Sequence, residues 1–410
     1  MDIRPILSTL LRHKTAAALI VLEIALSCAI ICNAMFLIGG RVDRLNIVSG
    51  LAENEIVRVQ LTGIGEDADA AALTRSDLAL LRGLPGVKSA SVSNQVPFVN
   101  SSWNTSVQLK PDQDQSTLNA TMYMADNQFL DTLGLKLVAG RKFAADEMIE
   151  FAALDAPGST VKIPSVIITQ SMADKLFPGQ SAVGKSFYSG GNDPIRVVGV
   201  VEHLVRPSDQ GGAVAHEYSM IYPVNVPYNL GGNYLIRTEP SRRDETLKAA
   251  VAALEKNGPT RIILEENTKT VEELRTRYYR QDTAMVWMLV AVIIALLVVT
   301  ALGIVGLASF WVQQRTKQIG VRRALGATRG QILRYFQTEN FLLATIGIVL
   351  GMLMAYGINQ LLMGKYELPR LPAIYLPVGA IALWLLGQLS VFGPARRAAS
   401  VPPAVATRSV

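Results

Sequence analysis

Four long apolar stretches constrain this chain of 410 residues more than any other feature. They cover residues 15–38, 284–312, about 341–358 and about 373–393. A helix needs about 20 such residues to cross the hydrocarbon core of a bilayer. The third stretch is the shortest, but an amphipathic flank can extend it. The sequence therefore predicts four transmembrane helices, with a long charged segment between the first two.

The first stretch has a competing interpretation as a cleaved signal sequence, because ALSC at residues 25–28 resembles a lipoprotein cleavage site. However, the apolar run continues past Cys28 to Ile38 and contains Glu23, which favours a retained helix. Both cysteines of the chain, Cys28 and Cys32, fall in this stretch. We therefore expect the segment between the first two spans to fold without a disulfide.

Basic residues mark one side of the predicted membrane. They cluster before the first span, between the second and third spans, and after the fourth, and residues 313–335 contain no acid. The positive-inside rule places all three segments in the cytoplasm. The residues are Arg4, Arg12, Lys14, Arg315, Lys317, Arg322, Arg323, Arg329, Arg334, Arg396, Arg397 and Arg408.

Residues 43–282 then lie outside. They carry 24 Lys and Arg against 29 Asp and Glu, a net charge of −5, whereas the whole chain carries +6. The basic excess therefore belongs to the membrane and cytoplasmic parts, and we expect no nucleic-acid partner.

Helix-like and strand-like segments alternate in this outside segment. Helical spacing marks residues 74–84, which we expect to start at Thr74, as well as 127–133 and 241–256, whereas 165–169 and 195–202 are typical of buried strands. Because there is no strict repeat, we expect a mixed sheet covered by helices rather than a barrel.

The sequence GQSAVGKS at residues 179–186 satisfies the nucleotide-binding pattern G-x-x-x-x-G-K-[ST]. A functional phosphate loop follows a strand and opens a helix, whereas this segment follows the helix-like SMADKLFPG and leads into FYSGGNDP. We therefore expect a glycine turn that enters a strand.

No other pattern indicates catalysis. The histidines His13, His203 and His216 are not clustered with Cys, His or carboxylates at metal-ligand spacing, and no G-x-S-x-G motif is present. We expect neither a catalytic residue nor a cofactor or metal site in this chain.

The cytoplasmic segment QQRTKQIGVRRALGATRGQILRYF, residues 313–336, is the most informative. It predicts a short helix ended by Gly326, then a second helix that opens on a Thr328/Gln331 capping box and continues into the third span. Ile319, Leu325 and Ile332 are its expected apolar contacts. Such an elbow either rests on anionic lipid or transmits force from a soluble partner.

This segment resembles the signature of the MacB-like and FtsX-like permeases of ABC transporters, in QIGVRRALGATRGQI. FLDTLGLKLVAGRKF, LFPGQSAVGKSF and IRVVGVVEH resemble successive parts of the MacB-type periplasmic domain, and PARRAASVPPAVATR resembles the family's C-terminal tail. The resemblance implies an α-helical protein of the bacterial inner membrane with four transmembrane helices and a large mixed α/β periplasmic domain inserted between helices 1 and 2.

The implied domain plan places both termini in the cytoplasm. Its parts are the N-terminus with transmembrane helix 1 (1–42), the periplasmic domain (43–282), transmembrane helix 2 (283–312), the coupling elbow (313–335), transmembrane helix 3 (336–362), an external loop (363–372), transmembrane helix 4 (373–393) and the tail (394–410).

The resemblance also implies a mechanotransmission mechanism. Two permeases, identical or different, each rest on a cytosolic ABC ATPase subunit that binds ATP and magnesium, and movement of the membrane helices reaches the outside domains. Only about fourteen residues precede the first span, so we expect a separate ATPase subunit. The implied ATPase-coupling residues are Ile319, Gly320, Arg322, Ala324, Leu325, Gly326 and Ala327.

Two features within the spans are candidates for an intramembrane interface. Gly347, Gly351 and Ala355 repeat every four residues and form a face of small residues, suited equally to packing inside one subunit and to a dimer contact. Glu23 is costly in a membrane and should face a partner helix or a wet cavity, in a coupling or a structural role.

Three functions fit the resemblance. We expect export of a peptide, antibiotic or lipid-linked substrate, with a periplasmic adaptor and an outer-membrane channel as further partners. An FtsX-like signalling permease would instead activate a cell-wall hydrolase in the periplasm. For a lipoprotein-extracting permease, depletion of the protein would leave lipoproteins mislocalised.

Overall fold

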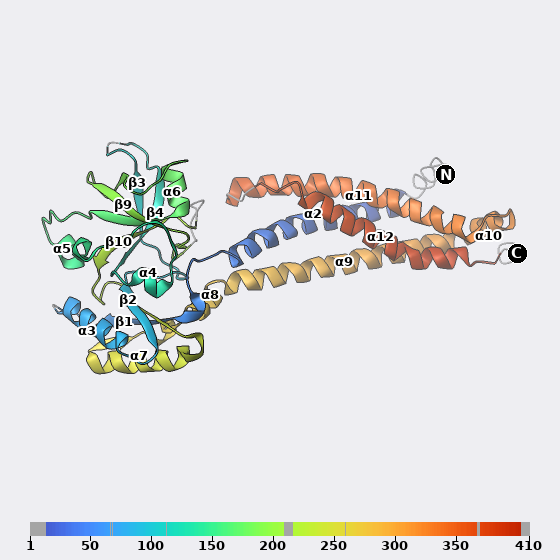
Figure 1. The fold of residues 1–410 in the computed structure, drawn as a ribbon. Helices are drawn as coiled ribbons and strands as arrows, with labels where there is room; N and C mark the ends of the chain where they lie inside the picture. Colours follow the sequence, from blue (N-terminus) through green and yellow to red (C-terminus); the bar gives the residue numbers. More distant parts are fainter. Residues whose placement is uncertain are drawn as a thin grey trace. The chain divides into compact units, whose positions relative to one another are not determined.

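The computed structural model describes residues 14–65, 67, 69–111, 113–208, 216–258, 260–366 and 370–402. The chain divides into two compact units (Figure 1). One contains residues 1–46 and 281–410, and the other contains residues 47–280, which lie between the first two long helices in the sequence. Arg4, Arg12 and His13 near the N-terminus, and Arg408 in the tail, lie outside the described residues.

The described part of the first unit is a bundle of helices in which four are long and apolar enough to cross a membrane. They are α2 (Lys14–Leu45), α9 (Arg280–Gln314), α11 (Arg329–Tyr366) and α12 (Tyr375–Ala399). The prediction of four membrane helices with a large domain after the first is therefore confirmed. Helix α12 continues past Gly393 through Pro394 to Ala399, because the alanine-rich end of this helix is buried in the bundle.

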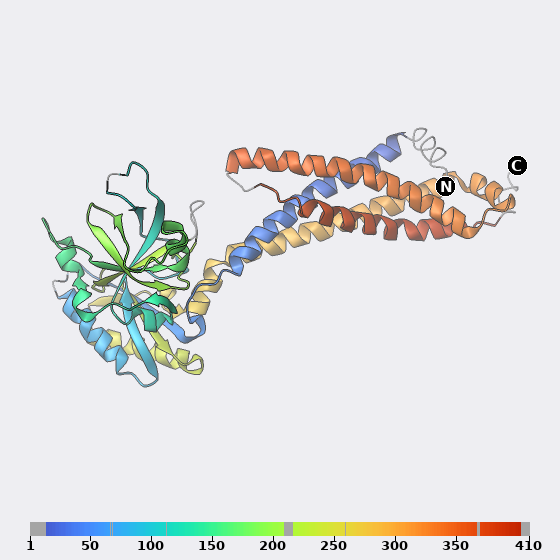
Figure 2. The same cartoon turned by 45° about the horizontal axis from the view of Figure 1, so that its top comes forward.

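The second unit contains an open antiparallel sheet with strand order β12-β1-β11-β2. Helices α3 and α7 pack on it (Figures 1 and 2). The elements of this part are β1 (Ile56–Gly63), α3 (Ala70–Arg82), β2 (Val87–Ser93), α4 (Phe129–Leu133), β11 (Asn233–Thr238), α7 (Arg243–Asn257), β12 (Arg261–Ile263), β13 (Lys269–Thr270) and α8 (Val271–Tyr278).

The two faces of β1 differ because side chains alternate along a strand. Val57, Val59 and Leu61 join a hydrophobic core that includes Leu81 of α3 and Leu254 of α7. The intervening Arg58 and Gln60 belong to the opposite face of the sheet.

Six further strands of the described chain close into a ring. The sheet is mixed, as expected, with parallel and antiparallel pairs, but the expectation that it forms no barrel was wrong. The path runs from β4 through β3, β8, β9 and β7 to β10, and β10 pairs with β4 again, in parallel. Closure leaves these strands without an unpaired edge, which open sheets must otherwise protect. The ring strands are β3 (Asn104–Gln108), β4 (Leu118–Ala125), β7 (Ser165–Thr169), β8 (Ser186–Ser189), β9 (Pro194–Val201) and β10 (Ser219–Asn225).

Short elements complete the second unit. Strand β5 pairs with β9, and β6 pairs with β10. The bounds are β5 (Leu137–Gly140), β6 (Ile149–Glu150), α5 (Phe151–Asp155) and α6 (Gln170–Leu176), with 3₁₀ helices at Glu53–Glu55, Ala145–Glu147, Pro240–Arg242 and Glu265–Asn267.

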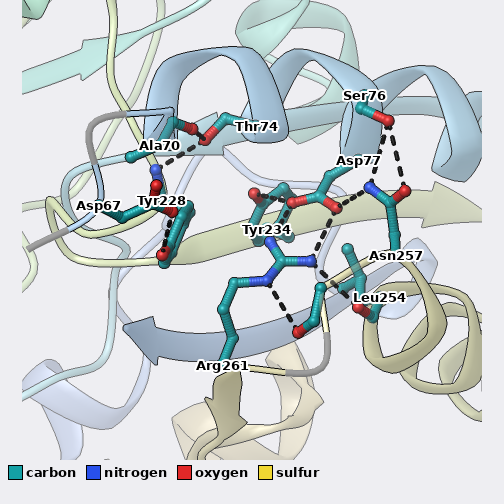
Figure 3. Close-up of polar contacts among 11 residues, drawn as sticks. Asp67, Ala70, Thr74, Ser76, Asp77, Tyr228, Tyr234, Leu254, Asn257 and Arg261 are labelled. Atoms are coloured by element: carbon teal, nitrogen blue, oxygen red, sulfur yellow. Dashed lines mark hydrogen bonds and ion pairs between the residues drawn. The ribbon is translucent and has the colours of Figure 1, made fainter. Parts of the chain in front are cut away.

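Helix α3 begins at Ala70, so the expectation that Thr74 starts it was wrong. Inside the helix, the Thr74 hydroxyl donates to the Ala70 carbonyl at 2.7 Å and accepts from the Tyr228 backbone N–H at 2.8 Å (Figure 3). A threonine that the sequence predicts as a helix cap therefore hydrogen-bonds the backbone of a distant loop instead.

A buried ion pair ties α3 to strand β12 (Figure 3). Asp77 accepts two hydrogen bonds from the Arg261 guanidinium, which is almost fully buried. The same carboxylate accepts from the Tyr234 hydroxyl at 2.5 Å and from the Asn257 amide at 2.8 Å. This single side chain thus connects α3, β11, α7 and β12.

Candidate functional site

The segment between α9 and α11 forms the predicted elbow. Helix α10 (Thr316–Ala324) ends in a Schellman motif. The Gly326 N–H donates to the Arg323 backbone carbonyl at 3.1 Å, and the Ala327 N–H donates to the Arg322 backbone carbonyl at 3.0 Å. Gly326 has a φ of 97°, in the left-handed region that favours glycine. The prediction that Gly326 ends the short helix is confirmed.

The predicted capping box is confirmed as well. The Gln331 backbone N–H donates to the Thr328 hydroxyl at 3.2 Å, and the Gln331 side-chain carbonyl accepts from the Thr328 backbone N–H at 2.9 Å. Helix α11 therefore begins at Arg329 and continues without a break into the third apolar stretch.

The elbow has its own hydrophobic cluster. Ile319 of α10 packs with Ile332 and Phe336 of α11 and with Ala395 and Ala398 of α12. Arg323 also donates a hydrogen bond to the Ala399 carbonyl at the end of α12. Helix α10 is therefore fixed to both α11 and α12.

A buried ion pair, which sequence reasoning missed, lies beside this cluster. The Arg315 guanidinium donates to both carboxylate oxygens of Glu339, at 3.0 and 2.9 Å, and lies 5.4 Å from the Trp311 ring. The available signal was Glu339, an acid next to the third apolar stretch. This pair links the junction between α9 and α10 to α11.

The seven predicted coupling residues differ in how exposed they are. Ile319 and Gly320 are buried in the bundle, and Ala327 is half-buried. Leu325 is 84% exposed, so the expectation that it is an apolar contact inside the elbow was wrong. The exposed members are Arg322, Ala324, Leu325 and Gly326.

The small-residue face of α11 packs within the chain. A Cβ on Gly347 would lie 2.8 Å from the Ile24 Cβ, and one on Gly351 would lie 2.5 Å from the Cys28 Cβ. Ala355 is fully buried, and its carbonyl accepts from the Asn33 amide at 3.2 Å. Of the two alternatives, the structure supports packing against α2 in the same subunit.

Glu23 of α2 faces α9. A Cβ on Gly303 would lie 2.3 Å from the Glu23 Oε2, so glycine provides the space that the carboxylate occupies. One turn along, the Ser27 and Thr300 hydroxyls are hydrogen-bonded at 2.8 Å. Glu23 therefore lies at a contact between two membrane helices of one chain.

The GQSAVGKS segment is a turn that enters a strand, as predicted. Gly179 and Gly184 have positive φ angles, and Ser186 opens strand β8 rather than a helix. The Lys185 ammonium donates to the Gln180 side chain and lies 5.0 Å from the Phe177 ring centroid. Without a helix N-terminus after it, the segment has no cradle for a phosphate.

We therefore expect that neither the purified chain nor its Lys185→Ala variant binds ATP. The Lys185 ammonium is engaged by the Gln180 side chain and the Phe177 ring, so we expect its removal to cost no contact with a nucleotide. Binding of a fluorescent ATP analogue measures this directly. Saturable binding that disappears in the variant would contradict it.

The helices, the inserted domain and the elbow together define a multi-pass membrane protein with an extracellular domain. The family profile described as MacB-like periplasmic core domain matches residues 17–254, more than half of the chain. The profile described as FtsX-like permease C-terminal matches residues 290–403, which include the elbow. The chain belongs to the MacB-like and FtsX-like family of ABC transporter permeases.

Individual relatives agree with this family. The uncharacterized ABC transporter permease YknZ of Bacillus subtilis (strain 168) is 24% identical over 99% of this chain and 98% of its own length. The macrolide export ATP-binding/permease protein MacB of Acinetobacter baylyi is 25% identical over 96% of this chain and 57% of its own length. The chain thus spans a little over half of that relative. The solved structure of the extracellular domain of YknZ matches 51% of this chain over 99% of its own length, with 20% identity and a TM-score of 0.32.

Proposed function

We propose that this chain is the permease subunit of a mechanotransmission-type ABC transporter. A separate ATPase subunit hydrolyses ATP with magnesium at the cytoplasmic face of the bacterial inner membrane, and the permease converts this into a movement of its periplasmic domain. The movement drives export of a peptide, antibiotic or lipid-linked substrate. The relative YknZ, named an ABC transporter permease and matched over almost its whole length, supports the permease role.

The exposed tip of the elbow is the observation that carries this proposal. Leu325 is 84% exposed at the end of α10, and Val321 one turn earlier is 51% exposed. Arg322 between them is exposed, and its guanidinium lies 5.1 Å from the Tyr335 ring centroid. An apolar tip with a cationic flank fits a complementary surface with an apolar pocket and acidic side chains.

The inner side of α10 explains how a load on this tip would reach the membrane helices. Ile319 and the Arg323 hydrogen bond fix α10 to α11 and α12. The Arg315–Glu339 ion pair fixes the preceding turn to α11. Close-packed contacts of this kind move together rather than deform separately. The buried residues of the predicted set therefore transmit, and the exposed residues receive.

We expect Leu325→Glu to reduce co-purification of the partner ATPase at least about tenfold, because apolar anchors dominate interface affinity. Arg322→Glu should have a smaller effect in the same direction. The measurements are pull-down of the ATPase by the tagged permease and ATP hydrolysis by the complex in nanodiscs. Ile64→Glu is the matched control, because Ile64 is 69% exposed in the inserted domain. Normal assembly and coupled hydrolysis with Leu325→Glu would remove the elbow tip from the mechanism.

The wider assembly is also a proposal. We include a second permease, identical or different, and a periplasmic adaptor with an outer-membrane channel. Mass spectrometry of proteins that co-purify with the tagged chain tests this. Recovery of a cell-wall hydrolase in place of an export adaptor would instead favour a signalling permease.

A further inference from the structure

The inserted domain contains a cavity of about 500 Å³ that the transport proposal does not use. Arg58 and Gln60 line it, from the face of β1 that is turned away from the hydrophobic core of α3 and α7. Asn233 of β11 lies beside them, because it pairs with Gln60 across the two strands. The volume is in the range of small-molecule sites in proteins.

Arg58 is unusual among the buried arginines that the structure describes. It is 3% exposed, and its Nε and Nη2 donate to the neutral Asn233 Oδ1 at 2.9 and 2.6 Å. Its Nη1 is buried and makes no hydrogen bond. The other two deeply buried arginines, Arg261 and Arg315, are each paired with a carboxylate.

No carboxylate among the described residues of the cavity wall compensates this charge. None of the described residues that line the cavity is acidic, and a second cation, Arg277, is among them. Burial, and then repulsion from Arg277, lowers the pKa of Arg58 to about 10, so the guanidinium remains charged at neutral pH. A buried charge without a counter-ion is costly, and an anionic ligand would remove that cost.

Gln60 supplies an acceptor without a partner. Its side-chain amide donates to the Gly231 carbonyl at 3.0 Å, which fixes the orientation of the group, and its Oε1 is buried without a hydrogen bond. Two residues that line the cavity therefore hold unused polar atoms, a donor on Arg58 and an acceptor on Gln60. A ligand that satisfies both carries an anionic group and a nearby N–H or O–H.

Aromatic residues form part of the apolar wall of the cavity, together with Val96, Val99 and Leu274. The aromatic residues are Phe98, Trp103 and Tyr278, of which Trp103 is 39% exposed. Phe98 has a φ of 66°, a left-handed conformation that is unfavourable for a bulky residue. The Arg275 guanidinium, 5.3 Å from the Phe98 ring centroid, and the Tyr278 and Tyr279 rings hold it there. Such strain gathers at ligand sites.

We propose that this cavity binds a small organic carboxylate that carries an adjacent N–H and an apolar or aromatic group, as the carboxyl-terminal residue of a peptide does. Arg58 binds the carboxylate, Gln60 accepts from the N–H, and Trp103 and Tyr278 contact the apolar group. The site lies wholly within the inserted domain, so its binding does not depend on an ATPase partner.

A pair of matched probes tests this on the full-length chain in lipid nanodiscs. N-acetyl-L-tryptophan has the carboxylate, the N–H and the aromatic group, whereas N-acetyl-L-tryptophanamide lacks only the charge. We expect saturable binding of the acid by titration calorimetry and binding of the amide weaker by about tenfold or more, as for the loss of a charge-assisted hydrogen bond. Inorganic phosphate at equal ionic strength should not displace the acid.

Variants locate the site. Trp103→Ala should weaken binding of the acid about tenfold and leave the fold intact, because the Trp103 side chain is partly exposed. Arg58→Met should abolish the preference for the acid over the amide. Arg75→Gln is the control, because Arg75 is exposed in the same domain and does not line this cavity.

Equal binding of acid and amide, absence of saturable binding, or an unchanged affinity in Trp103→Ala would overturn the proposal. Displacement by phosphate as strong as by the acid itself would overturn the assignment to an organic ligand. If Arg58→Met does not fold, the two probes and Trp103→Ala still decide the question.

Discussion

Gly351→Leu should prevent the four membrane helices from packing, and the amount of folded protein recovered from the membrane should fall at least about tenfold. A Cβ at this position would lie 2.5 Å from the Cys28 Cβ and 2.7 Å from the Ala25 carbonyl oxygen of α2. Part of the obstruction is backbone, which cannot turn aside as a side chain can. A leucine therefore forces α11 away from α2 along their contact.

The same helix offers a matched control. Gly357, also in α11, has nothing within 4 Å of an added Cβ and is exposed, so Gly357→Leu should leave the yield unchanged. Size-exclusion chromatography of both variants in mild detergent measures the folded fraction. If the two substitutions behave alike, the close contact between α2 and α11 does not hold the bundle together.

Arg261→Met should cost the inserted domain about 3–5 kcal/mol, because it leaves the Asp77 carboxylate buried without its counter-ion. Asp77 is fully buried, and the exposed fraction of the Arg261 side chain is 2%. The remaining donors to Asp77, Tyr234 and Asn257, are neutral (Figure 3). Thermal unfolding of the full-length protein, monitored through the protease susceptibility of residues 47–280, measures the loss of stability.

Two further variants make this test specific. Lys256→Met removes an exposed cation from helix α7 of the same domain and should change the unfolding temperature little. Combining Arg261→Met with Asp77→Leu should recover part of the stability, because no charge is then left buried alone. A double variant that is less stable than Arg261→Met alone would contradict this account of the ion pair.

Local signals in the sequence predicted the membrane helices and the elbow well. Hydropathy identified the four spans because burial in lipid acts on each residue of a helix. Gly326 and the Thr328/Gln331 box identified the elbow because helix caps involve groups only a few residues apart. The regular spacing of Gly347, Gly351 and Ala355 identified a close-packing face, although not which helix covers it.

Long-range pairing could not be predicted in the same way. The barrel ring depends on β10 meeting β4, two strands that are far apart in the sequence. Thr74 is of a residue type that commonly caps helices, but its hydroxyl accepts a hydrogen bond from the backbone of a loop at Tyr228. The carboxylate partners of Arg261 and Arg315 also lie elsewhere in the chain, on α3 and α11. In each case the competing interaction is remote, and so it is invisible to local pattern.

The sequence by itself determined the class of protein through the resemblance of its motifs. It also determined the four spans and the short capped helix at the elbow, since these follow from hydropathy and from hydrogen bonds between near neighbours. Only the tertiary structure decided which predicted residues are accessible. It buries Ile319 and Gly320, exposes Leu325, and leaves Arg58 charged beside a cavity whose described lining residues include no acid. The physical reason is that exposure and charge compensation depend on which distant segments pack against a residue, and folding alone brings those segments together.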